Sequence, residues 1–403
     1  MLKNITHVRG FTCWGSHIGI KSKRRDLALI VSDVPASAAA VFTKNVVCAE
    51  PVKLSRKHIE DGIAQAFVIN SGNANACTGE AGRIAAVAMA EVTAEELGIT
   101  VGNVIVSSTG IIGEPFPTEK VLTGIRNSVK KLSNREIAGS LTANAILTTD
   151  TFAKEGFTSF SIDGIEINMG GIAKGSGMIH PDMATMLGFI VCDLDITPPL
   201  LMDALQQAVS GSFNMITVDG DTSTNDMVAV MCNGKAGNRK IEKKDANFDL
   251  FVSHLEKLSV HLAKLIVSDG EGSTKLVEYR VNGSSSISEA RQIVRTVSNS
   301  NLVKTAIFGS DPNWGRIIAA AGRSGVYFDP EKVNLSIGTD LNKMVPVLEE
   351  GQPLPGSREK LRKIMTSSTI IVSLDLGMGS ENAVGWGSDF SYEYVRINAE
   401  YTT

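Results

Sequence analysis

The sequence predicts an α/β protein, because short β-rich runs alternate with longer amphipathic segments along the chain. The composition agrees, since 43% hydrophobic and 20% charged residues are close to the average for globular proteins. The length of 403 residues is enough for a full core and favours two or three domains over one. Disordered, collagen-like and coiled-coil classes are therefore excluded.

The expected elements follow in chain order. Strands are predicted at residues 26–32, 64–70, 103–108, 158–168, 186–193 and 227–232. Helices are predicted at residues 78–97, 117–132, 198–211 and 243–267. The first helix is well supported, because a Glu-Ala-Gly-Arg turn follows Thr78 and Gly98 stands where a helix should end.

A Gly/Ser-rich stretch at residues 282–286 predicts a turn between two parts of the chain. The first part, residues 1–284, holds the alternating elements. The second part, residues 285–403, begins with helices and ends in strand-like runs at 369–376 and 381–387. We therefore expect a domain boundary near residue 284.

Charge and cysteine usage restrict the partners. Net charge is −4, and the densest basic run, residues 21–25, is too short for a nucleic-acid surface. The five cysteines are odd in number and contain no C-x-x-C pair, so neither a disulfide framework nor a zinc site is predicted. Residues 1–10 lack the apolar stretch of a secretory signal, and no apolar run approaches a membrane span. We expect a cytoplasmic protein that binds neither membrane nor nucleic acid.

Common catalytic signatures are absent from the sequence. It has no phosphate loop, no H-E-x-x-H, no G-x-S-x-G elbow and no G-x-G-x-x-G, which disfavours ATP and nicotinamide chemistry. The glycine cluster at residues 170–177 lacks the last glycine of the dinucleotide pattern. The six histidines form no ligand spacing, so no metal site is predicted.

That glycine cluster leads into a segment where Thr185 follows Ala184 at the head of a predicted strand. A threonine in this place is usually a β-branched filler. A nucleophilic role needs a base, which an N-terminal threonine obtains from its own α-amino group. Thr185 gains such an amine only if the bond between Ala184 and Thr185 is cleaved.

Other small polar runs have two readings each. Residues 107–113 follow a predicted strand and either aim backbone N–H groups at an oxyanion or form an ordinary turn. Residues 70–77 and 214–226 are dense in small polar residues, which normally satisfy their own backbone in turns. The run at 214–226 either lines a polar pocket or braces one, and we favour bracing. Residues 268–273 and 311–316 are by themselves turns.

Taken together, these runs resemble the ornithine acetyltransferase family, the glutamate N-acetyltransferases of arginine biosynthesis. The resemblance covers essentially the whole chain. The matching segments are residues 70–75, 108–110, 148–151, 174–179, 184–187, 217–222, 311–316 and 401–403.

The resemblance implies a sandwich of β-sheets between helical layers, like that of N-terminal-nucleophile enzymes, with an additional C-terminal α+β region. It also implies self-cleavage between Ala184 and Thr185 into an α chain, 1–184, and a β chain, 185–403, that stay associated, most plausibly as two α and two β chains. Thr185 then attacks the acetyl group of N-acetylornithine, and glutamate takes that group from the acetyl-enzyme. No cofactor is implied.

Residue roles follow from the same resemblance. Thr109 and Gly110 match the family's oxyanion hole. The substrate-binding positions map onto a threonine among residues 148–151, for which we favour Thr149, and onto Lys174, Thr185, Glu271, Asn398 and Thr403. Lys174 suits a substrate carboxylate and Glu271 suits an ammonium group. The chain departs from the pattern at Ala153, where proline is expected, and at Asp182, where asparagine is frequent and a change can alter the rate of processing.

Two alternatives stay open at this level. An N-terminal-nucleophile amidohydrolase or aminopeptidase would pass the acyl group to water, whereas a non-catalytic amino-acid-binding protein would have no reason to cleave itself. The sequence also leaves open whether acetyl-CoA serves as a second acetyl donor.

Overall fold

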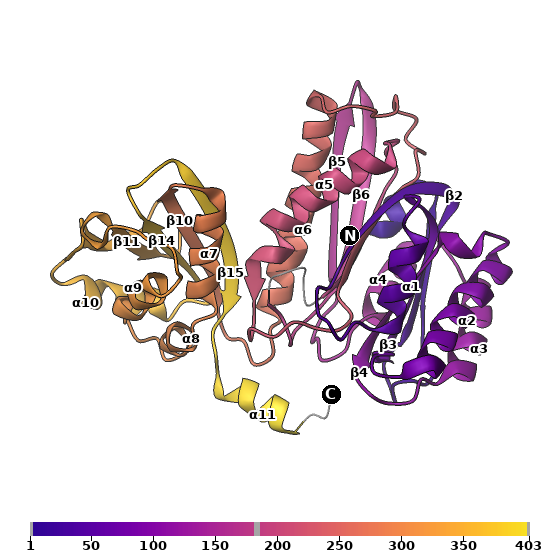
Figure 1. Cartoon of the computed structure of the whole chain (residues 1–403), viewed down its shortest axis with the longest axis horizontal. Coiled ribbons are helices and arrows are strands. Elements are labelled where there is room, and N and C mark those ends of the chain that lie inside the picture. The colour runs from indigo at the N-terminus through magenta and orange to yellow at the C-terminus, as the bar shows by residue number, and fades with distance from the viewer. Residues whose placement is uncertain (1–2, 181–185, 401–403) are drawn as a thin grey trace.

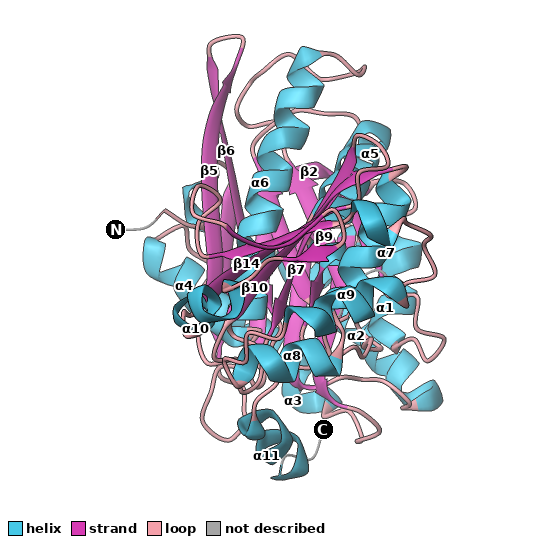
Figure 2. Ribbon diagram, turned by 90° about the vertical axis from the view of Figure 1, so that its left-hand side faces the viewer, coloured by secondary structure: helices cyan, strands magenta, loops and turns pink. Residues whose placement is uncertain are grey.

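A computed structural model describes residues 3–180 and 186–400. Within these ranges the strands form two sheets, with helices packed around and between them (Figures 1 and 2). The α/β fold with sheets between helical layers, predicted from the sequence, is confirmed. Ala184, Thr185 and Thr403, which carry central predictions, lie outside the described residues, as does Asp182.

The first sheet runs in the order β4-β3-β2-β9-β7-β6-β5, with β1 paired to β2. Its strands are β1 (Phe11–Ser16), β2 (Leu27–Phe42), β3 (Ile63–Asn73), β4 (Val104–Ile111), β5 (Lys154–Ile162), β6 (Ile165–Lys174), β7 (Leu187–Cys192) and β9 (Met227–Cys232). The β3–β4 and β7–β9 pairs are parallel. The central strands β9 and β7 follow residue 185 in the sequence, whereas the strands on either side of them precede it.

Helices cover both faces of this sheet. They are α1 (Glu50–His58), α2 (Gly79–Leu97), α3 (Thr118–Val129), α4 (Glu136–Ala145), α5 (Pro198–Gly211) and α6 (Ala246–Ser268). Side chains alternate along β2, so Leu27 and Leu29 pack with α2 and α3 while Ala28 and Ile30 pack with α4. The strand is therefore apolar at successive positions, as a sheet buried on both faces requires.

Local signals explain the helix ends. Helix α2 stops at Gly98, whose φ of +68° suits a residue without a side chain. Helix α6 begins later than predicted, because the Asp245 side chain caps it by accepting hydrogen bonds from the N–H groups of Asn247 and Phe248.

The second sheet runs in the order β13-β12-β11-β14-β10-β15-β8. Its elements are β8 (Ile216–Thr217), β10 (Leu276–Ser284), β11 (Asn334–Gly338), β12 (Val345–Glu349), β13 (Gln352–Pro353), β14 (Thr369–Asp375) and β15 (Glu381–Ser388), with α7 (Ile287–Ser298), α8 (Asn301–Phe308), α9 (Trp314–Gly322), α10 (Ser357–Met365) and α11 (Tyr392–Glu400). Helix α6 contacts both sheets, and its Lys264 Nζ lies 3.0 Å from Glu278 Oε2 on β10. The two sheets thus share one apolar core.

Several predicted elements are confirmed with the bounds expected from the sequence, including α5 and β9. The single strand predicted at 158–168 is wrong. This segment forms the β5–β6 hairpin, which turns at Asp163 and Gly164 with φ values of +50° and +81°. An Asp-Gly pair with positive φ at both residues is typical of a tight hairpin turn.

The turn predicted at residues 282–286 is also displaced, because residues 282–284 complete β10 and Ser286 caps α7 through Glu289 N. The domain boundary at residue 284, with parts 1–284 and 285–403, stays a prediction. No helix within residues 3–180 and 186–400 has both the length and the apolar character that a bilayer span requires.

Candidate active site

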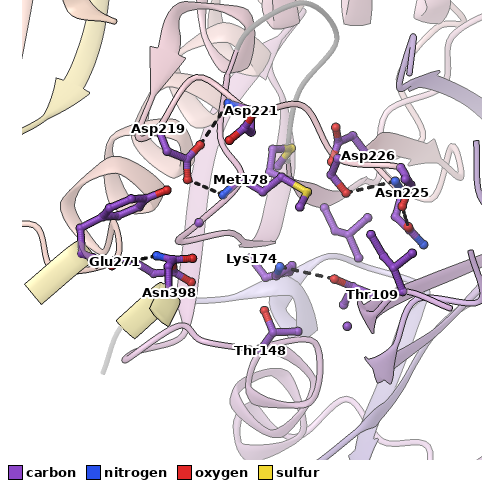
Figure 3. A pocket seen from close by; sticks show the side chains of 18 residues that line it. Thr109, Thr148, Lys174, Met178, Asp219, Asp221, Asn225, Asp226, Glu271 and Asn398 are labelled. Carbon is purple, nitrogen blue, oxygen red and sulfur yellow. Dashed lines mark hydrogen bonds between the residues drawn. The ribbon is translucent and has the colours of Figure 1, made fainter. Parts of the chain in front are cut away.

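A pocket of about 150 Å³ opens where β4 and β6 end and β7 and β9 begin (Figure 3). Helix α11, from the far end of the chain (Figure 1), contributes Tyr394 and Asn398 to its lining. The pocket is lined by Thr109, Gly110, Ile112, Thr148, Lys174, Gly177, Met178, Met186, Leu187, Asp219, Asp221, Ser223, Thr224, Asn225, Asp226, Glu271, Tyr394 and Asn398. Met186 and Leu187 line the pocket and directly follow the predicted nucleophile, Thr185, in the sequence.

Lys174 is the last residue of β6 and is buried at the pocket wall. Its Nζ donates a hydrogen bond of 3.4 Å to Thr109 Oγ1 on β4, although β3, β2, β9 and β7 lie between β4 and β6 in the sheet. Burial lowers the pKa of Lys174, and the nearby Asp150 carboxylate opposes that decrease. The tertiary fold thus places a cation beside the predicted oxyanion residue.

Gly110 follows Thr109 with a φ of +134°, which favours glycine. A Cβ at this position would lie 2.5 Å from Asn73 N and even closer to the Gly72 backbone. The ends of β3 and β4 therefore approach each other so closely that a side chain at residue 110 would separate them.

The polar run at residues 70–77 braces the pocket. Asn225 Nδ2 donates hydrogen bonds to Ala74 O at 2.6 Å and to Ser108 O at 2.8 Å, and Ser108 Oγ donates to Asn70 Oδ1 at 2.5 Å. The other polar run, residues 214–226, does more than brace. Its residues Asp219, Asp221 and 223–226 line the pocket themselves.

A buried ion cluster that the sequence analysis missed supports the floor of the site. Lys154 Nζ lies 2.7 Å from Asp150 Oδ1 and 2.6 Å from Asp269 Oδ2, and all three side chains are almost fully buried. Burial alone raises the pKa of Asp150, but the charges of Lys174 and Lys154 outweigh burial and lower this pKa to about 2. The Asp150 carboxylate therefore stays ionised at neutral pH.

The same cluster fixes backbone segments that reach the pocket. Asp150 accepts hydrogen bonds from Thr148 N at 2.9 Å and Gly175 N at 2.7 Å, and Asp269 accepts one from Thr151 N at 3.0 Å. The ion cluster thus connects the residues before β5, the residue after β6 and the turn after α6. No sequence pattern marks this cluster, because Lys154 and Asp269 are 115 residues apart.

Glu271 and Asn398 meet at the opposite end of the pocket from Thr109 (Figure 3). Asn398 Nδ2 donates to Glu271 Oε2 at 2.9 Å, and Glu271 N donates to Ser176 O at 2.8 Å. A Cβ on Gly177 would lie 2.6 Å from Glu271 Oε1, so the carboxylate rests against this glycine. The pocket therefore has a cation near one end and a carboxylate at the other.

Asp219 and Asp226 are, with Asp221, further carboxylates in the wall. Asp219 accepts hydrogen bonds from Met178 N at 2.6 Å and Ile179 N at 2.8 Å, and burial raises its pKa in spite of them. Asp226 is buried immediately before β9, and burial raises its pKa well above the usual value while Lys174 opposes the rise. A carboxylate just before an all-apolar strand is the sequence signal for Asp226.

The structure brings five predicted site residues together in this pocket: Thr109, Gly110, Lys174, Glu271 and Asn398. Thr149 does not line the pocket, whereas Thr148 does. The Thr149 hydroxyl lies 3.0 Å from Ser176 Oγ instead, so its role in substrate binding stays a prediction. Within the described ranges, no three His, Cys, Asp or Glu side chains gather as metal ligands would.

Comparison with known proteins identifies the family. Residues 12–403 match the ArgJ family. The chain belongs to that family. The arginine biosynthesis bifunctional protein ArgJ of Symbiobacterium thermophilum is 46% identical over 402 residues, which cover 99% of this chain and 98% of that protein. Its counterpart in Thermotoga neapolitana is 47% identical over 398 residues, 98% and 99% of the two chains. The family resemblance inferred from the sequence motifs is confirmed.

Two solved structures are similar to parts of the chain. A crystal structure of the ArgJ protein from Bacillus halodurans is 43% identical, with a TM-score of 0.44, and covers 46% of this chain and 94% of its own. The ornithine acetyltransferase of Mycobacterium tuberculosis, solved in complex with ornithine, is 33% identical, with a TM-score of 0.40, and covers 45% and 95%.

Proposed function

We propose that this member of the ArgJ family transfers the acetyl group of N-acetylornithine to glutamate in arginine biosynthesis, working in the cytoplasm. The observation that carries the proposal is the pocket with Lys174 near one end and Glu271 at the other, into which the chain leads directly after Thr185. These charges suit the carboxylate and the ammonium group of an amino acid. ArgJ relatives bear the name of arginine biosynthesis proteins.

The proposed chemistry has two half-reactions. After cleavage of the Ala184–Thr185 bond, the Thr185 hydroxyl attacks the acetyl carbonyl while its α-amine takes the proton. Ornithine leaves, and the acetyl group remains as an ester on Thr185. The amine of glutamate then attacks this ester, which forms N-acetylglutamate and frees the hydroxyl. Thr109 and Gly110 are the proposed donors to the oxyanion of both steps.

We also propose that the fragments 1–184 and 185–403 stay together, and that the assembly holds two copies of each. The strand order supports association, because β7 is hydrogen-bonded to β6 and β9 to β2 across the fragment boundary. Each of these two ladders has six register pairs, and both ladders would have to open before the fragments separate. We expect both fragments in a single peak on native gel filtration, and two separate peaks would contradict this.

The test measures products and covalent state. Purified protein is given N-acetylornithine with and without glutamate, and intact mass spectrometry under denaturing conditions is run alongside. We expect two fragments, an acetyl adduct on the 185–403 fragment without glutamate, and N-acetylglutamate when glutamate is present. Acetate without N-acetylglutamate would instead indicate a hydrolase, and an uncut chain that binds ornithine without turnover would indicate a binding protein. Replacing N-acetylornithine by acetyl-CoA decides whether a second donor is used.

Gly177→Ala should weaken substrate binding with little effect on folding. The new methyl group overlaps the tip of the Glu271 side chain, which can swing away, so the proposed ammonium site is displaced while the core stays intact. We expect KM for N-acetylornithine to rise about tenfold, the loss of roughly 1.4 kcal/mol of binding. Steady-state kinetics measure this change. Gly102→Ala, where a Cβ meets nothing within 4 Å, is the matched control, and equal kinetics for the two variants would contradict the assignment of Glu271.

A further inference from the structure

Self-cleavage raises a question that acetyl transfer does not. Once cut, Thr185 has a free α-amine that serves as its base. Before the cut, that nitrogen is part of the peptide bond with Ala184 and cannot accept the hydroxyl proton. The first reaction of the chain therefore needs another base, and the inference below rests on the proposed function.

Strand pairing places one carboxylate next to Met186, the first described residue after the cleavage site. In the parallel β7–β9 pair, Leu187 is the partner of Met227, and Met227 N donates a hydrogen bond to Met186 O at 3.1 Å. One step earlier in the same register, Asp226 stands beside Met186, and its carboxylate accepts a hydrogen bond from the Met186 N–H. This register involves only residues that the structure describes. Met186 follows Thr185 directly in the sequence.

The Asp226 side chain also has a free acceptor. It is 2% exposed and lines the pocket, yet its Oδ2 has no hydrogen-bond partner among the described residues. Leaving a buried carboxylate oxygen without a hydrogen-bond donor costs free energy. Such an atom in a folded protein therefore points to a function. Ser223 donates to the same carboxylate, which holds the group in place on the pocket wall.

Asp219 and Glu271, two other carboxylates of the pocket, are already engaged. Asp219 uses its oxygens for the N–H groups of Met178 and Ile179, and Glu271 accepts from Asn398. Lys174 lies near Asp226, and its positive charge favours the ionised carboxylate, whereas burial makes that carboxylate a stronger base. Asp226 therefore lies beside Met186, has a carboxylate oxygen free to accept a proton, and is a stronger base than an exposed carboxylate.

We propose that Asp226 is the general base of self-cleavage. Asp226 takes the proton of the Thr185 hydroxyl as Oγ bonds to the Ala184 carbonyl carbon, and it returns that proton to the Thr185 nitrogen as the carbon–nitrogen bond breaks. The product of this step is an ester between residues 184 and 185. Water then splits the ester, which leaves a carboxylate on Ala184 and both a hydroxyl and a free amine on Thr185.

Asp226→Asn tests the proposal, because the amide keeps the shape but cannot accept the proton in this way. We expect self-cleavage of the full chain, followed on denaturing gels, to slow by roughly 10²–10⁴-fold, the usual contribution of a general base. Asp203→Asn, a half-exposed position on α5 that pairs with Lys244, is the control and should be cut at the wild-type rate. Cleavage of Asp226→Asn within a few-fold of wild type would overturn the proposal.

Hydroxylamine, which splits esters but not amides, separates a base from a merely structural residue. If Asp226 acts before the ester forms, uncut Asp226→Asn protein should stay uncut in hydroxylamine. Rapid cleavage by hydroxylamine would show that the ester forms without this base and would overturn the proposal.

Asp226→Glu decides the matter should Asp226→Asn fold poorly. It retains a carboxylate while disturbing packing at least as much, so it should be cut faster than Asp226→Asn. Equal rates for the two variants would assign Asp226 a packing role. If the wild-type chain is never cut, both this proposal and the proposed function are wrong. If wild type and Asp226→Asn are cut equally fast, only this proposal is wrong.

Discussion

Thr185→Ala is expected to remain a single chain of 403 residues and to lose acetyl transfer by ~10⁴-fold or more, the order of loss seen when a catalytic nucleophile is removed. Alanine has no hydroxyl, so it can neither attack the Ala184 carbonyl nor carry an acetyl ester. Intact mass spectrometry under denaturing conditions reports the cleavage, and the formation of N-acetylglutamate reports the transfer.

Thr185→Ser is the matched variant, because it keeps a hydroxyl at the same atom. We expect it to be cut and to transfer acetyl groups at a reduced but measurable rate. A Thr185→Ala chain that is cut, or that is uncut and still as active as wild type, would show that the reaction runs without this hydroxyl.

Lys154→Met is expected to destabilise the protein by about 3–5 kcal/mol, because it leaves the buried carboxylates of Asp150 and Asp269 without their shared cation. Methionine fills much of the same space, so the loss is electrostatic rather than a cavity effect. Urea denaturation followed by circular dichroism gives the shift in midpoint. Activity should fall as well, since Asp150 holds Thr148 N and Gly175 N at the pocket.

Lys53→Met is the control for this variant. Lys53 pairs with Glu50 at 2.6 Å on the surface of α1, with 55% of its side chain exposed, and such pairs contribute about 0–1 kcal/mol. A Lys154→Met protein no less stable than Lys53→Met would mean that the buried carboxylates find other partners or bind protons at little cost.

The sequence predicted much of the candidate site because the family resemblance is carried by short runs near the ligand. Thr109, Gly110, Lys174, Glu271 and Asn398 were all expected as site residues and all line one pocket. Thr149 shows the limit of this reasoning. Among adjacent threonines the backbone alone decides which one points inward, and the structure turns Thr148 into the pocket and Thr149 towards Ser176.

The carboxylates show a second limit. Asp219 and Asp226 lie in a polar run that was expected mainly to brace the pocket, because short polar residues usually satisfy their own backbone in turns. Strand pairing decides otherwise. The register of β9 against β7 carries Asp226 to Met186, forty residues away in the sequence, and no local pattern contains that register.

By itself, the sequence determined the alternation of helices and strands, the bounds of elements such as α5 and β9, and the family, because periodicity, capping residues and motifs are properties of neighbouring residues. Only the tertiary structure decided which charges are buried together and which strands share a sheet. The ion cluster around Lys154, and the placement of β10 and β8 in the second sheet, depend on contacts between distant segments. Such contacts form only when burial of the whole core offsets the entropy of bringing those segments together.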